Sequence, residues 1–183
     1  MNSNTPVDPI HLPAYGFAQC AHLRQRRKYT GEPYATHCLA VARTVAQHTD
    51  DIDVISAALL HDVVEDTDIA ADEIQTEFGA RVARLVLEVT DVSRPEDGNR
   101  PKRKELDRMY LARSSPEGAT IKLADLIDNT SSVVAGDAKF AAVYLREKEA
   151  LLPCLEHGAG ELMGKARAVL AEAQGRLAEV AQP

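Results

Sequence analysis

The chain has 183 residues, a length that suits one domain with at most a short extension. Hydrophobic residues make up 45% of it and charged residues 27%, a composition that excludes wholesale disorder. The formal net charge of −7 argues against general nucleic-acid binding and against attachment to anionic membranes.

Segment 1–12 carries prolines among polar residues and is predicted to be a flexible tail. Apolar residues at helical spacing then predict a series of α-helices, separated by turns rich in glycine, proline and aspartate. These helices are expected over 14–28, 34–48, 54–64, 67–78, 80–89, 102–113, 119–134, 138–152 and 161–180. The prediction is therefore an all-α fold, with a main domain over 13–155 and a C-terminal helix in 156–183 packed on it.

The cysteines do not suggest a disulfide framework or a thiolate zinc site. Cys20, Cys38 and Cys154 are odd in number and far apart in the sequence. The first residues lack the basic and apolar regions of a signal peptide, and no apolar run approaches the length of a membrane span. We therefore expect a soluble protein of the cytoplasm.

Ionisable residues follow the most apolar run of the chain. His61 and Asp62 come directly after 57–60, and Glu65 and Asp66 follow one helical turn later. Burying such groups is costly unless a cation or an ordered polar network compensates. The alternative is a solvated helix end.

Two other predicted helices carry polar residues among apolar ones. His37 interrupts the helix over 34–48, although a single buried histidine is more often a core residue than a ligand. Lys122, Asp125 and Asn129 share one face of a later helix, a stripe that faces either solvent or a site.

Taken together, two histidines and two aspartates form a mixed nitrogen and oxygen ligand set: His37, His61, Asp62 and Asp125. This set suits one Mn²⁺ ion better than a closed structural zinc site, and other divalent ions stay open. Glu65 and Asp66 could orient or deprotonate a metal-activated water. Basic clusters at 24–28 and 100–104 could pair with phosphate, or could be solvated helix ends.

These residues resemble the HD-domain metal-dependent phosphohydrolases, and in particular their Rel/SpoT hydrolase branch. The segment AALLHDVVEDT at 57–67 matches that branch almost letter for letter. IKLAD at 121–125 matches as well, and so does the segment from Arg27 through GEPY to His37. The resemblance covers roughly 15–155 and implies an HD-domain helical bundle of about 8–10 helices.

The resemblance implies hydrolysis of the 3′-pyrophosphate of the alarmones (p)ppGpp, with release of pyrophosphate and usually with Mn²⁺. It assigns the two histidines and two aspartates to the metal, and Glu65 and Asp66 to the attacking water. It also implies substrate contacts at Arg27, Lys28, Arg100, Lys122, Asn129 and Tyr144. The expected partner is a small nucleotide, with no nucleic acid and no membrane, and a homodimer is compatible with this interpretation.

Departures from the branch fall on the substrate side. Ser131 stands where the branch commonly has arginine, and the loop at 94–100 is more acidic than usual. An adenosine alarmone, (p)ppApp, is therefore a preferred or additional substrate to test. The alternatives are another HD-type nucleotide phosphohydrolase (a 5′-nucleotidase or triphosphohydrolase) and a non-catalytic alarmone-binding module.

Overall fold

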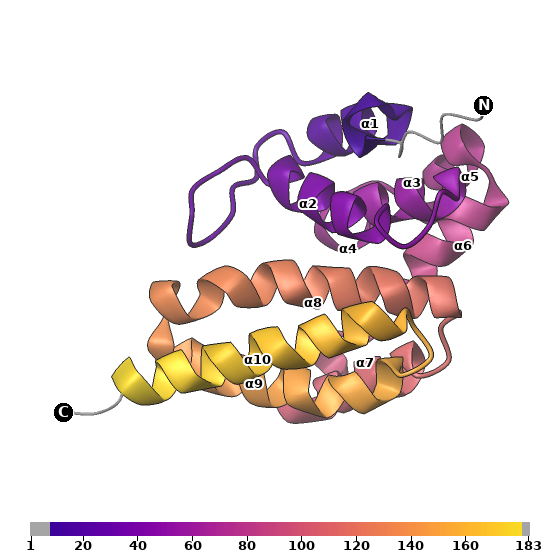
Figure 1. Ribbon diagram of the computed structural model, residues 1–183. Helices are drawn as coiled ribbons and strands as arrows, with labels where there is room; N and C mark the ends of the chain where they lie inside the picture. Colours follow the sequence, from indigo (N-terminus) through magenta and orange to yellow (C-terminus); the bar gives the residue numbers. More distant parts are fainter. Residues whose placement is uncertain (1–7, 181–183) are drawn as a thin grey trace. The chain divides into compact units, whose positions relative to one another are not determined.

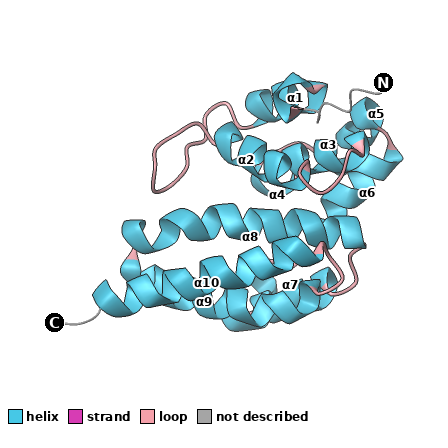
Figure 2. Ribbon diagram, viewed as in Figure 1, coloured by secondary structure: helices cyan, strands magenta, loops and turns pink. Residues whose placement is uncertain are grey.

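Every regular element in the computed structural model is a helix over the residues that it describes, 8–180 (Figure 1, Figure 2). The α-helices are α1 (Pro13–Ala21), α2 (Ala35–Val45), α3 (Ile52–Leu60), α4 (Val63–Asp66), α5 (Ala71–Phe78), α6 (Ala80–Val89), α7 (Arg100–Leu111), α8 (Pro116–Gly136), α9 (Ala138–Leu151) and α10 (Gly160–Val180). Short 3₁₀ helices are η1 (Pro9–His11), η2 (Pro95–Asp97) and η3 (Leu152–Leu155). The prediction of an all-α fold with about 8–10 helices is confirmed.

The predicted flexible tail differs from the structure in its last part. Residues 1–7 lie outside the described residues, but η1 occupies Pro9–His11. The Asp8 carboxylate accepts a hydrogen bond from the Ile10 amide and pairs with Arg43 at 3.3 Å. These contacts, together with the buried Pro9 ring, hold the segment in place.

The described chain divides into two compact units. The first unit comprises residues 8–27 and 32–90, and the second comprises 28–31 and 91–180. Within the second unit, α10 packs on α8 and α9.

The core of the first unit is built on α3. All residues from Val54 to Leu60 are buried, and α3 packs against α1, α2 and α6. The apolar spacing predicted for 80–89 is realised in α6, which buries Val82, Leu85, Val86 and Val89. Full burial of each such side chain is worth about 1.5–3 kcal/mol, so this face fixes α3 firmly.

Two predicted helices end earlier than the sequence pattern suggested. The first ends at Ala21 rather than 28, because the backbone of 25–27 pairs with that of 32–34 instead. The Arg27 amide donates to the Glu32 carbonyl and the Tyr34 amide to the Gln25 carbonyl, at 2.9 and 3.1 Å. Gly31, with φ +74°, allows the loop between them to turn.

The helix predicted over 54–64 is interrupted at its polar residues. His61 closes α3, and Asp62, with φ −98° and ψ −4°, precedes the first residue of α4. The interruption places both side chains at a junction between two helices, and this geometry differs from the continuous helical face that the spacing suggested.

The second unit is organised around α8. This helix of 21 residues packs against both α9 and α10, and Figure 1 shows the three running side by side. The Ser115 hydroxyl caps its first turn by accepting from the Gly118 amide at 3.1 Å. Among residues 8–180, none of the helices combines the length and the apolarity that a membrane crossing requires.

Candidate metal and substrate site

Three of the predicted metal ligands meet in the first unit. His37 comes from α2, while His61 and Asp62 come from the junction between α3 and α4. The two Nε2 atoms lie 3.3 Å apart, and the Asp62 Oδ2 atom lies 3.4 Å from one and 3.0 Å from the other. All three side chains are buried, so a potential metal site is enclosed by the packed helices.

The hydrogen bonding of His61 directs its Nε2 atom toward the other two candidate ligands. Its Nδ1 atom lies 2.9 Å from the Ala58 carbonyl oxygen, which can only accept, so Nδ1 carries the proton. Nε2 faces His37 Nε2 and Asp62 Oδ2, so it can carry either a second proton paired with Asp62 or, in the neutral ring, a lone pair for a cation. Two imidazoles and one carboxylate fit a divalent ion and leave coordination positions open, as catalytic sites require.

Asp62 is prepared as an anionic ligand. Burial raises the pKa of its carboxyl, but the charges and hydrogen bonds of His61 and His37 outweigh burial and hold this pKa well below its ordinary value. The Tyr34 hydroxyl donates a further hydrogen bond to Asp62 Oδ2 at 2.6 Å. Tyr34 belongs to the GEPY segment, and sequence reasoning gave it no role.

The two residues predicted to act on water lie on α4. Glu65 and Asp66 end this helix of four residues, directly after the ligand junction. Burial raises the pKa of the Asp66 carboxyl above its ordinary value, and the negative charge of Asp62 raises it further. A carboxyl with a raised pKa exchanges protons more readily near neutral pH, which is the property of a general acid or base.

The predicted polar stripe on α8 forms a connected group in the second unit. The Asn129 amide donates to Asp125 Oδ1 at 2.5 Å, and Lys122 Nζ lies 3.3 Å from Asp125 Oδ2. Lys122 and Asp125 are both buried although they are charged. Because Asp125 belongs to the other unit, its place as a fourth metal ligand stays a prediction.

Side chains of α9 lie close to this stripe. The Tyr144 hydroxyl is 3.4 Å from the Thr130 hydroxyl, and Lys148 Nζ lies 5.2 Å from the centre of the Tyr144 ring. Burial raises the pKa of Tyr144, and the charge of Asp125 adds to the effect, so the phenol stays protonated. Burial lowers the pKa of Lys148. Nothing in the sequence singles out this residue, because it lies among other charged residues.

Two predicted phosphate-binding cations flank one aromatic ring of the second unit. Lys28 Nζ lies 5.2 Å from the centre of the Phe140 ring, and the Arg100 guanidinium lies 5.4 Å from it. Glu147 holds Arg100 through two hydrogen bonds of 2.7 and 2.8 Å. Lys28 forms a longer ion pair, 3.9 Å, with Asp137 and is the more available of the two for a ligand.

The predicted site residues thus fall into two groups. The first unit holds His37, His61, Asp62, Glu65, Asp66 and Arg27, and the second holds Lys28, Arg100, Lys122, Asp125, Asn129 and Tyr144. The basic cluster at 100–104 is only partly available, since Lys104 is paired with Asp91 and Asp107. The spacing of the basic residues in the sequence did not indicate that Lys104 would pair with these two aspartates.

Comparison with known proteins adds three findings. A family model described as "HD domain" matches residues 14–147. The human guanosine-3′,5′-bis(diphosphate) 3′-pyrophosphohydrolase MESH1 is 46% identical over 123 residues, which are 64% of this chain and 66% of that protein. The zebrafish protein of the same name is 40% identical over 131 residues, covering 69% of this chain and 70% of the relative.

Bacterial and structural relatives agree with these matches. The guanosine-3′,5′-bis(diphosphate) 3′-pyrophosphohydrolase of Aquifex aeolicus is 39% identical over 120 residues, which are 66% of this chain but only 17% of that protein. A solved structure of a metazoan orthologue of SpoT that hydrolyses ppGpp superposes with a TM-score of 0.79 at 29% identity. The superposition covers 93% of this chain and 98% of the other.

Proposed function

Because the chain belongs to the HD-domain family, we propose that it is a metal-dependent 3′-pyrophosphohydrolase of alarmone nucleotides, (p)ppGpp and/or (p)ppApp. The observation that carries the proposal is the buried convergence of His37, His61 and Asp62 beside two carboxylates on α4. The reaction named for the human, zebrafish and Aquifex relatives supports the choice of substrate and bond.

The proposed cofactor is one Mn²⁺ ion, held by His37, His61 and Asp62, with Asp125 as the fourth protein ligand. Imidazole and carboxylate together suit this ion, and the open positions suit water and a phosphate oxygen. When bound, such an ion lowers the pKa of a coordinated water and offsets negative charge on phosphate. Tyr34 holds the Asp62 carboxylate in place through its hydrogen bond of 2.6 Å.

In the proposed reaction, the oxygen of a water forms a bond to the phosphorus attached at the 3′-oxygen, and the bond between that phosphorus and O3′ breaks. Glu65 or Asp66 accepts the proton of the attacking water, and O3′ leaves with a proton. The products are pyrophosphate and a nucleotide with a free 3′-hydroxyl. The raised pKa of Asp66 supports a role for this carboxyl in the proton transfers.

The remaining predicted residues are proposed to hold the substrate. Lys28 and Arg100 would neutralise phosphate charge beside the Phe140 ring, and Arg27 directly precedes Lys28. Lys122, Asn129 and Tyr144 would contact the ribose and the 3′-phosphate side. The cationic side chains among these residues would offset the negative charge of the pyrophosphoryl group in the transition state.

Removal of the metal tests the proposal directly. Dialysis against a chelator is expected to abolish pyrophosphate release from ppGpp and ppApp, and added Mn²⁺ to restore it. Chromatography of the products identifies the bond that breaks. Release of inorganic phosphate or triphosphate would indicate another nucleotide phosphohydrolase, and binding without turnover by the metal-loaded protein would indicate a binding module. Either result would overturn the proposal.

Gly136 offers a test of the loop that carries Lys28. A Cβ atom at this last residue of α8 would overlap the Tyr29 ring, so Gly136→Ala is expected to displace residues 28–31. We expect KM to rise in the same direction as in Lys28→Ala, where loss of a charge-assisted contact predicts about a tenfold to hundredfold increase. Steady-state kinetics measures both, with Gly175→Ala in the open part of α10 as the matched control. An unchanged KM in Gly136→Ala would contradict the role of this loop.

A further inference from the structure

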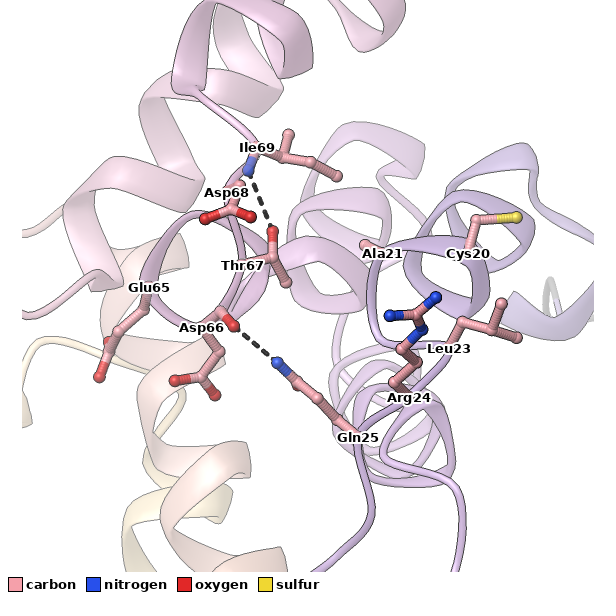
Figure 3. A pocket seen from close by; sticks show the side chains of 10 residues that line it. All are labelled: Cys20, Ala21, Leu23, Arg24, Gln25, Glu65, Asp66, Thr67, Asp68 and Ile69. Atoms are coloured by element: carbon pink, nitrogen blue, oxygen red, sulfur yellow. Dashed lines mark hydrogen bonds between the residues drawn. The ribbon is translucent and has the colours of Figure 1, made fainter.

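A buried histidine and a glutamine connect the end of α1 to the end of α4. His22 follows α1, is 2% exposed, and its Nδ1 atom lies 2.6 Å from Gln25 Oε1. The Gln25 amide nitrogen donates to the backbone carbonyl of Asp66 at 2.6 Å. Figure 3 shows the Gln25 side chain reaching Asp66 at one side of a cleft of about 810 Å³ in the first unit.

The chemistry of these groups permits one orientation. The Asp66 carbonyl can only accept, so it must face the NH₂ group of Gln25. The Gln25 oxygen then faces His22, and Nδ1 of the imidazole has to be the donor. The other ring nitrogen, Nε2, is buried and has no hydrogen-bond partner among residues 8–180. The geometry therefore selects Nδ1–H over Nε2–H as the tautomer of the uncharged His22 ring.

The hydrogen bond from Gln25 ends on α4, a helix that is too short to be stable by itself. A helix of four residues gains little from its internal hydrogen bonds, and the carbonyls of its last turn have no partner within it. The Thr67 hydroxyl supplies one partner by donating to the Val63 carbonyl at 2.6 Å, and Gln25 supplies the partner for Asp66. An element from outside α4 thus fixes the backbone on which Glu65 and Asp66 stand.

The same group of residues also reaches the other end of α4. The Tyr34 ring lies 4.8 Å from the His22 ring between centres, and the Tyr34 amide donates to the Gln25 carbonyl. The Tyr34 hydroxyl donates to Asp62, the residue that precedes α4. Movement of His22 or Gln25 would therefore change the position of α4 relative to the ligand junction.

We propose that His22 and Gln25 are positioning residues that set the place of Glu65 and Asp66 relative to the metal-binding junction. The hydrogen bonds of their side chains described above go to each other and to the Asp66 backbone, and not to a predicted metal ligand or substrate-binding residue. The inference rests on the proposed function, because it assigns the two carboxylates to proton transfer. Displacement of a catalytic group by about 1 Å costs on the order of 100-fold in rate.

Matched variants separate positioning from simple packing. In His22→Asn the amide nitrogen can take the place of Nδ1, whereas in His22→Gln it can take only the place of Nε2. Gln25→Glu keeps the acceptor for His22 but turns a carboxylate oxygen toward the Asp66 carbonyl. We expect kcat to fall about 10–100-fold in Gln25→Glu and His22→Gln and less in His22→Asn, with KM and bound metal unchanged. Gln75→Glu, the same change at an exposed position of α5, is the control.

The tautomer of His22 is measured on the unaltered protein by ¹⁵N NMR of its histidine rings. A protonated Nδ1 and a bare Nε2 are expected, and the reverse would overturn the proposal even if every variant failed to fold. Normal kcat in both Gln25→Glu and His22→Gln would also overturn it, as would loss of metal together with rate. If the unaltered, metal-loaded protein hydrolyses no alarmone, the proposed function fails instead, a result distinct from these.

Discussion

Replacement of His61 by alanine is expected to remove both the bound metal and the hydrolytic activity. His61 Nε2 lies 3.3 Å from His37 Nε2 and 3.0 Å from Asp62 Oδ2, so it directly contacts both other members of the ligand cluster. Loss of a group that only supports a metal ligand lowers metal affinity or activity by about 10–100-fold. Loss of the ligand itself should lower them by more than about 100-fold. Metal content measured by mass spectrometry, together with pyrophosphate release, checks this expectation.

The same variant provides a readout that does not depend on activity. At metal concentrations of about 100 times Kd, binding stabilises the folded protein by about 2.7 kcal/mol, which should raise Tm by roughly 5–10 °C. This rise is expected for the unaltered protein and for His11→Ala, whose histidine is exposed on η1, but not for His61→Ala. A full metal-dependent shift in His61→Ala would refute the assigned metal site.

Substitution of the two carboxylates on α4 should separate metal binding from catalysis. Glu65→Gln and Asp66→Asn are expected to keep the metal, because the ligand junction precedes both residues. Each should lower kcat by about 10²–10⁴-fold if it takes part in proton transfer to or from the water. Asp68→Asn, an exposed carboxyl two residues farther along the chain, is the matched control.

The pH dependence distinguishes the two carboxylates. A base with a raised pKa loses its proton-accepting form as the pH falls through that pKa. If Asp66 is the base, the acidic limb of kcat/KM should therefore lie above the ordinary aspartate value of about 3.9. The limb should persist in Glu65→Gln and disappear from the residual activity of Asp66→Asn. Equal profiles in both variants would remove this role from Asp66.

Helical periodicity predicted most of the fold because it reports local geometry. The apolar positions Val82, Leu85, Val86 and Val89 recur at the spacing of one helix face, and the structure buries all four in α6. The ends of helices were less predictable. The helix predicted through residue 28 ends at Ala21, because pairing between 25–27 and 32–34 competes with helical hydrogen bonds.

The candidate metal ligands were also predictable from local sequence. The residues that hold the site in place through hydrogen bonds were not. His37, His61 and Asp62 stood out as polar groups in apolar surroundings, and the structure brings these three together. The hydrogen bond from Tyr34 to Asp62 joins residues 28 positions apart, and the one from Gln25 to Asp66 joins residues 41 apart. Nothing in the spacing of such residues indicates that they will meet.

The order of apolar and polar residues along the chain was sufficient to establish an all-helical protein that carries imidazoles and carboxylates suited to a divalent ion. Residue type and periodicity are properties of short segments, so they need no knowledge of the packed chain. Only the packing of α2 against α3 brought two imidazole nitrogens to 3.3 Å, and only the interruption after Leu60 turned Asp62 toward them. Distances of this kind depend on how buried faces fit one another, which the three-dimensional structure alone decides.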